Sequence, residues 1–254
     1  MSAPKLPPLG EGWAYFLDID GTLLDLAEHP RAVRVSVALP LLERLLTAAE
    51  GAVALISGRS VDDIERLFYP LVFPIAGQHG TERRTAEGLL LRHAPPLEHL
   101  GRAASELVRF TAAHTELVVE NKGMALALHY RRAPELRDLV EHEMRTLAAS
   151  LGDAFELQEG KLVFELKPSG KNKGSAIAEF MREAPFAGRL PVFIGDDLTD
   201  EHGFEVVNEL GGHSVKVGPG PSRARWRLAD SSAVREWLAA CIGRARVTRR
   251  TAAQ

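Results

Sequence analysis

The sequence predicts an α/β protein with a doubly wound, Rossmann-like parallel sheet and a small α/β cap inserted into it. Short apolar runs that stop at polar loops alternate with segments of helical spacing, which is the pattern of parallel strands joined by helices. The middle of the chain replaces this alternation with closely spaced strand signals. We therefore expect a main sheet in two parts, residues 1–99 and 171–254, with the cap at residues 100–170.

The expected strands of the main sheet are three apolar runs at residues 13–17, 52–56 and 190–194. Helical spacing follows at residues 39–49, and residues 60–63 have the form of a capping box that begins a second helix. A third helix is expected at residues 173–183. Because ligands of doubly wound sheets bind outside the carboxyl ends of the strands, the loops after the three strands are the candidate site.

The expected cap begins with strands at residues 117–120 and 125–130 around the turn Asn121-Lys122-Gly123. An amphipathic helix follows at residues 134–151, and Gly152 provides its C-terminal stop. The cap then closes with a hairpin of residues 155–157 and 162–166, for which we predict a turn at Glu159-Gly160.

The composition is that of an ordinary globular enzyme. The 254 residues are 45% hydrophobic, and the formal net charge of −3 argues against a nucleic-acid partner. Residues 1–13 lack the apolar core of a signal peptide, and the chain has no membrane-length apolar run. Cys241 has no second cysteine to pair with, so a reducing cytoplasm is the expected compartment. We also expect a monomer with no membrane partner. Residues 244–254 are expected to form a frayed tail.

The strongest chemical signal is Asp18-Ile19-Asp20-Gly21-Thr22, directly after the first strand. Asp18 is ionised at neutral pH, and a bound Mg²⁺ would hold it beside an anionic phosphate, so it is the expected nucleophile. Asp20 is placed to protonate the leaving oxygen and then to deprotonate water. Gly21 allows a sharp turn, and Thr22 is expected to orient Asp20.

Two further loops carry candidate phosphate ligands. Ser57-Gly58-Arg59 offers a hydroxyl and backbone N–H groups near a helix start, although Ser57 taken alone is more typical of a turn or cap. Lys171 and Lys173 stand at another helix start, where a cation opposes the helix dipole unless an anion lies close by. We predict that Lys173 pairs with the phosphate and with Asp18; a pair of solvated surface lysines is the alternative.

The loop after the third strand, residues 195–201, holds four acidic side chains, which would repel one another without a cation. We predict that Asp196 is a direct metal ligand. Asp197 and Asp200 are expected to hold Lys173, a metal-bound water or the loop itself. A solvated acidic loop is the alternative.

These four elements, in this order, resemble the signature motifs of the haloacid dehalogenase (HAD) superfamily. The closer resemblance is to the trehalose-6-phosphate phosphatase family, and it covers roughly residues 15–237. It rests on residues 17–24, 54–60, 76–80, 120–123, 128–131, 165–174 and 195–201. The resemblance implies hydrolysis of trehalose 6-phosphate through an aspartyl-phosphate intermediate. It also implies Mg²⁺ bound by Asp18, the backbone carbonyl of Asp20, and Asp196.

The cap contributes the candidate sugar ligands. Since residues two apart in a strand share a face, Glu120 lies with Lys122 and Glu165 with Lys167. Such a face is either solvated or able to bind many sugar hydroxyls. The resemblance favours sugar recognition and adds Arg131 and His79 as weaker candidates.

Two alternatives remain open from the sequence. The first is a related capped phosphatase that acts on another sugar phosphate, such as a sucrose or glucosyl-glycerate phosphate. The second is a signalling module, like a receiver domain, that only stores phosphate on an aspartate. Receivers are about half this length, and Asp20 would have no leaving group to protonate there.

Overall fold

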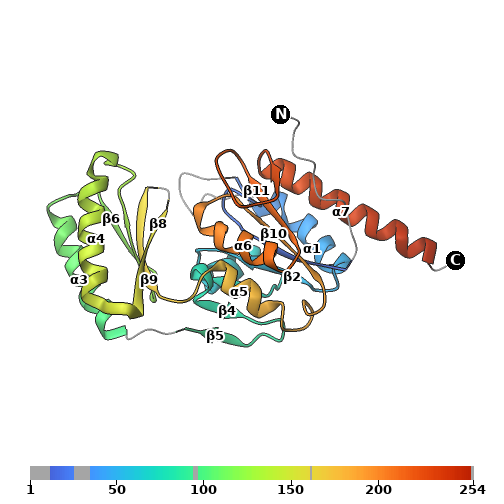
Figure 1. Cartoon of the computed structure of the whole chain (residues 1–254), viewed down its shortest axis with the longest axis horizontal. Coiled ribbons are helices and arrows are strands. Elements are labelled where there is room, and N and C mark those ends of the chain that lie inside the picture. The colour runs from blue at the N-terminus through green and yellow to red at the C-terminus, as the bar shows by residue number, and fades with distance from the viewer. Residues whose placement is uncertain (1–11, 26–34, 94–96, 161, 253–254) are drawn as a thin grey trace. The chain divides into compact units, whose positions relative to one another are not determined.

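The computed structural model describes residues 12–25, 35–93, 97–160 and 162–252 (Figure 1). The chain divides into two compact units, of which the core unit comprises residues 1–91 and 172–254 and the cap unit residues 92–171. The predicted cap range of residues 100–170 falls within the second unit. Most of the N-terminal segment examined for a signal peptide, residues 1–11, lies outside the described residues.

The core unit contains an eight-stranded sheet in the order β12-β11-β10-β1-β2-β3-β4-β5. Its strands are β1 (Trp13–Leu17), β2 (Val53–Ile56), β3 (Ile75–Gly77), β4 (Glu82–Arg84), β5 (Leu90–Arg92), β10 (Leu190–Gly195), β11 (His213–Val217) and β12 (Trp226–Leu228). Neighbouring strands from β12 to β3 are parallel, and β4 is antiparallel to β3. The three strands predicted from apolar runs are β1, β2 and β10.

The helices of the core unit are α1 (Leu39–Ala48), α2 (Val61–Phe68), α5 (Lys173–Phe180), α6 (Glu201–Glu209) and α7 (Ser231–Ala252). Two predicted boundaries were wrong. Helix α5 ends three residues early, because the N–H groups of Arg182 and Glu183 donate to carbonyls three rather than four residues back, which tightens the chain into turns ahead of Pro185. The expected frayed tail instead continues α7 to Ala252, since its arginines and alanines are strong helix formers.

The order of the strands reverses between β1 and β10, because the chain runs outward from β1 to β3 on one side and from β10 to β12 on the other. Right-handed crossovers in opposite directions place α1 and α6 on opposite faces of the sheet. Helix α1 packs against α7, and α5 packs against α6 (Figure 1). The reversal makes the carboxyl ends of β1 and β10 the ligand-binding edge of the fold.

The cap unit contains an antiparallel sheet in the order β6-β7-β9-β8. Its elements are α3 (Leu97–Ala112), β6 (Val118–Asn121), β7 (Leu126–His129), α4 (Arg137–Leu151), β8 (Phe155–Gly160) and β9 (Val163–Pro168). One sheet face packs Phe164 and Leu166 against the helices. The turn predicted at Glu159-Gly160 was wrong: both residues pair with β9, so the strand runs three residues beyond its predicted end at Leu157.

No helix within the described ranges is long and apolar enough to cross a membrane.

Candidate active site

The site is built where β1 and β10 end side by side. Strand β1 delivers Asp18, whose backbone N–H donates to the carbonyl of Ile194 in β10 (3.0 Å). Strand β10 ends one residue before Asp196. Both carboxylates therefore come from rigid strand ends at the point where the strand order reverses, which fixes their separation.

A buried lysine joins the acidic groups. The Lys173 ammonium donates to Asp18 Oδ1 (2.7 Å) and to Asp200 Oδ1 (2.6 Å), and all three side chains are buried. Burial alone lowers the pKa of Lys173, but the two aspartates outweigh it and raise the pKa, so the ammonium stays charged. The structure thus brings together Asp18 and Lys173 as the sequence predicted.

A lysine at a helix start is normally unfavourable, and the contacts of Lys173 explain why it is tolerated here. It is the first residue of α5, where Asn172 and Ser175 form a reciprocal capping box. A cation here opposes the helix dipole, but the carboxylates of Asp18 and Asp200 lie within hydrogen-bond distance and offset that repulsion. The helix start therefore serves to aim the ammonium at the end of β1.

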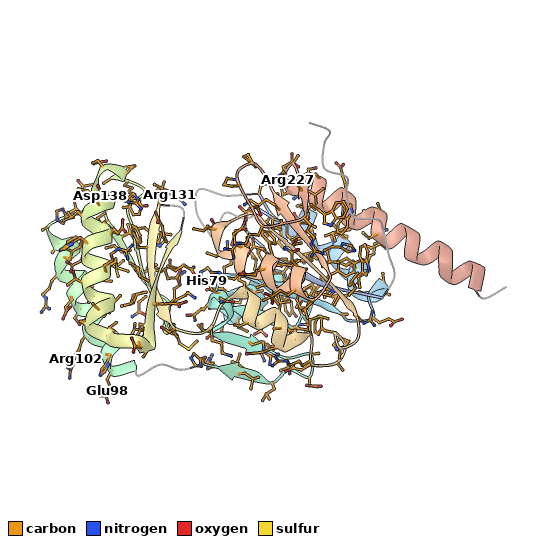
Figure 2. All side chains as sticks on the ribbon, in the orientation of Figure 1. His79, Glu98, Arg102, Arg131, Asp138 and Arg227 are labelled. Atoms are coloured by element: carbon orange, nitrogen blue, oxygen red, sulfur yellow. The ribbon has the colours of Figure 1, made fainter. Side chains whose placement is uncertain are left out.

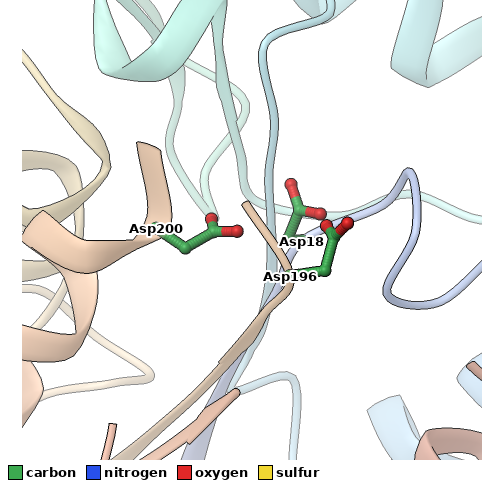
Figure 3. Close-up of side chains that lie close together, drawn as sticks. All are labelled: Asp18, Asp196 and Asp200. Carbon is green, nitrogen blue, oxygen red and sulfur yellow. The ribbon is translucent and has the colours of Figure 1, made fainter. Parts of the chain in front are cut away.

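Carboxylate oxygens of Asp18, Asp196 and Asp200 all lie within 4.8 Å of one another (Figure 3). Burial raises the pKa of Asp18 well above its usual range; burial and the nearby Asp200 raise that of Asp196 to about 6. Lys173 alone does not neutralise this cluster. An all-oxygen donor set with excess negative charge fits a hard divalent cation.

Asp200 has both oxygens engaged. Its Oδ1 accepts from Lys173, and its Oδ2 accepts from the backbone N–H of Asp197 (2.9 Å). A Cβ atom on Gly195 would lie 2.3 Å from the Asp200 carboxyl carbon, so only glycine fits there. Asp200 thus holds Lys173 and the loop. Asp197 Oδ1 instead accepts from the N–H of Leu198 (2.6 Å) and contributes to the loop alone.

The loop after β1 packs tightly on Asp196. A Cβ atom on Gly21, which has φ +81°, would lie 2.2 Å from Asp196 Oδ2. Thr22 Oγ1 donates to Asp196 Oδ1 (3.3 Å), so the prediction that Thr22 orients Asp20 was wrong. The sharp turn at Gly21 directs Thr22 toward the end of β10, and the hydroxyl orients the predicted metal ligand.

Arg59 contacts Asp20 in the structure. Its Nε and Nη2 donate to the two carboxylate oxygens of Asp20, each at 2.6 Å, and its backbone N–H donates to the buried Ser57 Oγ (3.2 Å). The predicted phosphate ligand is thus engaged with the predicted general acid. Sequence patterns gave no signal for this pair, because the two residues are far apart in the chain.

The loop at residues 77–80 holds the backbone of residues 57–59 in place. The N–H of Gln78 donates to the Arg59 carbonyl (2.8 Å) and that of His79 to the Ser57 carbonyl (3.0 Å). Gln78 and His79 both have positive φ, and a Cβ on Gly58 would meet His79 Nε2 at 2.6 Å. His79, labelled in Figure 2, therefore packs against the predicted phosphate loop.

Lys216 is a residue of the site that sequence reasoning missed. It lies on β11 opposite Gly195, is buried, and donates through Nζ to the backbone carbonyl of Asp196. A lysine between Val215 and Val217 was the available signal, since buried lysines are rare without a partner. Lys216 fixes the start of the acidic loop.

In the cap unit, strand pairing places Glu120, Ala127, Glu165 and Gln158 in one row. Residues two away on the same strands share that face, which lies opposite the apolar one. Its polar pairs are Lys122 Nζ with Glu165 (3.0 Å), His129 with Glu120 (2.9 Å) and Lys167 with Glu156 (2.5 Å). The predicted Glu120, Lys122, Glu165 and Lys167 thus lie on one polar face.

Arg131 follows β7, and its side chain is exposed (Figure 2). Among the described residues no hydrogen bond or ion pair is recorded for its side chain, and its part in sugar recognition stays a prediction.

The model of the trehalose-phosphatase family matches residues 16–232. The chain belongs to the trehalose-phosphatase family. A trehalose-6-phosphate phosphatase of Escherichia coli (strain K12) is 48% identical over 240 residues, which cover 92% of this chain and 88% of that protein. A probable trehalose-phosphate phosphatase of Sinorhizobium fredii (strain NBRC 101917 / NGR234) is 44% identical over 91% of this chain and 88% of its own length.

Solved structures agree with a trehalose-phosphatase fold. The crystal structure of a trehalose-6-phosphate phosphatase related protein superposes with a TM-score of 0.71 at 27% identity, covering 90% of this chain and 96% of that chain. The C-terminal domain of trehalose-6-phosphate phosphatase from C. albicans has a TM-score of 0.75 at 23% identity, with 92% of both chains covered, and supports the fold alone. The predicted HAD core with a separate cap sheet is confirmed as a fold class.

Proposed function

We propose that this trehalose phosphatase hydrolyses trehalose 6-phosphate to trehalose and phosphate in a Mg²⁺-dependent reaction with Asp18 as nucleophile. The observation that carries the proposal is the buried Asp18 at the end of β1, 2.7 Å from the Lys173 ammonium and beside Asp196. A buried carboxylate with a fixed cation and a neighbouring acidic group is an arrangement suited to attack on an anionic phosphate.

The reaction consists of two displacements at phosphorus. Lys173 holds Asp18 Oδ1, which leaves the other oxygen to form the bond to phosphorus while the sugar oxygen departs with a proton from Asp20. Asp20 then takes a proton from water, whose oxygen attacks the aspartyl phosphate. This second step releases inorganic phosphate and restores Asp18.

The metal would be held by Asp18, Asp196 and the backbone carbonyl of Asp20. Asp200 is left out of this set, because its two oxygens hold Lys173 and the N–H of Asp197 and thereby fix the loop. When bound, Mg²⁺ supplies the positive charge that offsets the repulsion between the substrate phosphate and the aspartates. Thr22 and Lys216 keep Asp196 and its loop in place.

Sugar recognition is assigned to the polar face of the cap unit. Carboxylates of Glu120 and Glu165 accept hydrogen bonds from sugar hydroxyls, and the ammonium groups of Lys122 and Lys167 donate to them. The cross-strand pair of Lys122 with Glu165 (3.0 Å) orders these groups before the sugar binds. We place the enzyme in the cytoplasm as a monomer, with a soluble sugar phosphate as its partner.

Phosphate release from trehalose 6-phosphate, measured with Mg²⁺ and with EDTA, tests the proposal. The expected result is rapid release that needs the metal. A panel of other sugar phosphates is the control for the substrate, and faster release from sucrose or glucosyl-glycerate phosphates would overturn the assignment of trehalose 6-phosphate. Equal release with EDTA would overturn the metal requirement.

A further inference from the structure

The pair formed by Arg59 and Asp20 restrains a group that the reaction needs to move. The guanidinium contacts both carboxylate oxygens at 2.6 Å, in the two-point geometry that is the strongest arrangement of these groups. An Asp20 held in this way cannot turn toward a leaving oxygen. The general acid is therefore restrained in the free enzyme.

The backbone on which Arg59 stands is fixed. Its N–H is bound to Ser57 and its carbonyl to Gln78, while His79 closes the space beside Gly58. The side chain is the part that can change partners. Ser57, a predicted phosphate ligand, lies two residues before Arg59 and accepts from its backbone N–H, so a phosphate bound at Ser57 would lie beside Arg59.

The pair is also accessible enough to be exchanged. The Arg59 side chain is 16% exposed and that of Asp20 is 33% exposed. Water competes for such groups, so the ion pair is weaker than a fully buried one. A phosphate with two negative charges and three acceptor oxygens competes well against a single carboxylate for a guanidinium.

We propose that Arg59 exchanges Asp20 for the substrate phosphate, so that phosphate binding releases the general acid. In the free enzyme Arg59 holds Asp20; with phosphate present the guanidinium contacts the phosphate, and Asp20 is free to turn to the sugar oxygen. Arg59 acts as a positioning residue for Asp20. The proposal rests on the proposed function, because it takes Asp20 as the general acid.

A binding cycle with inorganic phosphate tests this exchange. The dissociation constant is measured by calorimetry with Mg²⁺ on the full-length protein and on the variants Asp20→Asn, Arg59→Met and the double variant. If Asp20 competes for Arg59, Asp20→Asn tightens binding by about tenfold, the effect of losing one competing charged hydrogen-bonded partner. In the Arg59→Met background the same change has less than about a threefold effect.

Equal tightening in both backgrounds would overturn the proposal, because it would show only the loss of a nearby negative charge. No tightening in either background would overturn it as well. Arg59→Gln, which also lacks the positive charge, repeats the cycle if the methionine variant melts early. Arg66→Met is the matched control, since it removes a guanidinium from an exposed pair with Asp63 on α2 and should leave phosphate binding unchanged.

Failure of this cycle is distinguishable from failure of the proposed function. The cycle measures phosphate binding without any sugar, whereas the proposed function is tested by phosphate release from trehalose 6-phosphate with the unaltered enzyme. An enzyme that hydrolyses trehalose 6-phosphate but shows equal tightening in both backgrounds would keep its function and lose only the exchange.

Discussion

The acidic site of the core unit and the polar face of the cap unit use charged side chains in different ways. In the core, Lys173 and Asp200 are 3% and 0% exposed, and glycines leave no room for movement around the carboxylates. On the cap face, Glu165 and Lys167 are buried as well, but Glu120 and Glu156 are about half exposed, and the charges are paired across strands. The core unit thus buries its charges together, whereas the cap face leaves part of its charged pairs open to solvent, which suits the roles proposed for them in chemistry and in sugar recognition.

The largest expected effect is that of Lys173→Met. It leaves Asp18 and Asp200 buried without their cation, and we expect kcat to fall by at least about 10⁴-fold, as with other residues that act directly on the reacting group. Steady-state rates with trehalose 6-phosphate and with p-nitrophenyl phosphate are the measurement. Equal loss on both substrates supports a purely chemical role; retained activity on either one would contradict it.

A smaller effect is expected for Gly21→Ala. The added methyl group would lie 2.2 Å from an Asp196 oxygen and displace it, and a displacement of about 1 Å costs roughly 100-fold in rate. Gly218→Ala is the matched control, because Gly218 also has positive φ but has open space around its Cβ position. If the two variants lost activity equally, backbone strain rather than contact with Asp196 would be the cause.

The cap is tested by Lys122→Met. Loss of this ammonium removes a proposed sugar ligand and leaves Glu165 without its 3.0 Å partner, so kcat/KM for trehalose 6-phosphate should fall by about 10- to 100-fold. The rate on p-nitrophenyl phosphate, which lacks the sugar, should change little. Arg145→Met, on the exposed side of α4, is the control. Equal losses of activity on both substrates would contradict a role of Lys122 in sugar recognition alone.

The smallest effect on activity is expected for Arg83→Met. Arg83 is buried, but its partners Glu179 and Glu183 are 30% and 35% exposed, so loss of these ion pairs and of the contact with the Phe180 ring should cost about 1–2 kcal/mol of stability while kcat stays unchanged. Denaturant unfolding measures the stability, and steady-state kinetics measure kcat. A large loss of kcat at full stability would contradict the expectation that Arg83 stabilises the fold without taking part in catalysis.

The pH dependence follows from Glu183. Its contact with Arg83 lowers the pKa of Glu183, so this carboxylate stabilises the folded state at neutral pH. The stability difference between the wild type and Arg83→Met should shrink in acid as the pH falls through that lowered pKa. A difference that grew in acid would contradict the pairing.

The sequence predicted those site residues that follow strand ends. Asp18 and Asp196 could be assigned because a buried strand and the polar residue after it are adjacent in the chain. Lys173 was assigned because a cation at a helix start needs a partner. In each case a local pattern carried the information, and the doubly wound topology brought the loops to one edge.

Side-chain partners from distant segments could not be predicted. The contacts of Arg59 with Asp20 and of Lys216 with Asp196, and the donation of Thr22 to Asp196, each depend on how two loops approach, which no local pattern encodes. The end of α7 was also missed. The arginines of residues 244–254 suggested a frayed tail, but the helix propensity of the segment continues the helix to Ala252.

The central claim is tested most directly by mapping the phosphorylated residue. Wild-type enzyme turning over trehalose 6-phosphate is quenched with acid and digested, and the peptides are analysed by mass spectrometry. We predict a phosphoryl group on Asp18 that is absent from a correctly folded Asp18→Asn variant, which releases no phosphate. A phosphoryl group on another residue, or turnover by Asp18→Asn near the wild-type rate, would contradict the account.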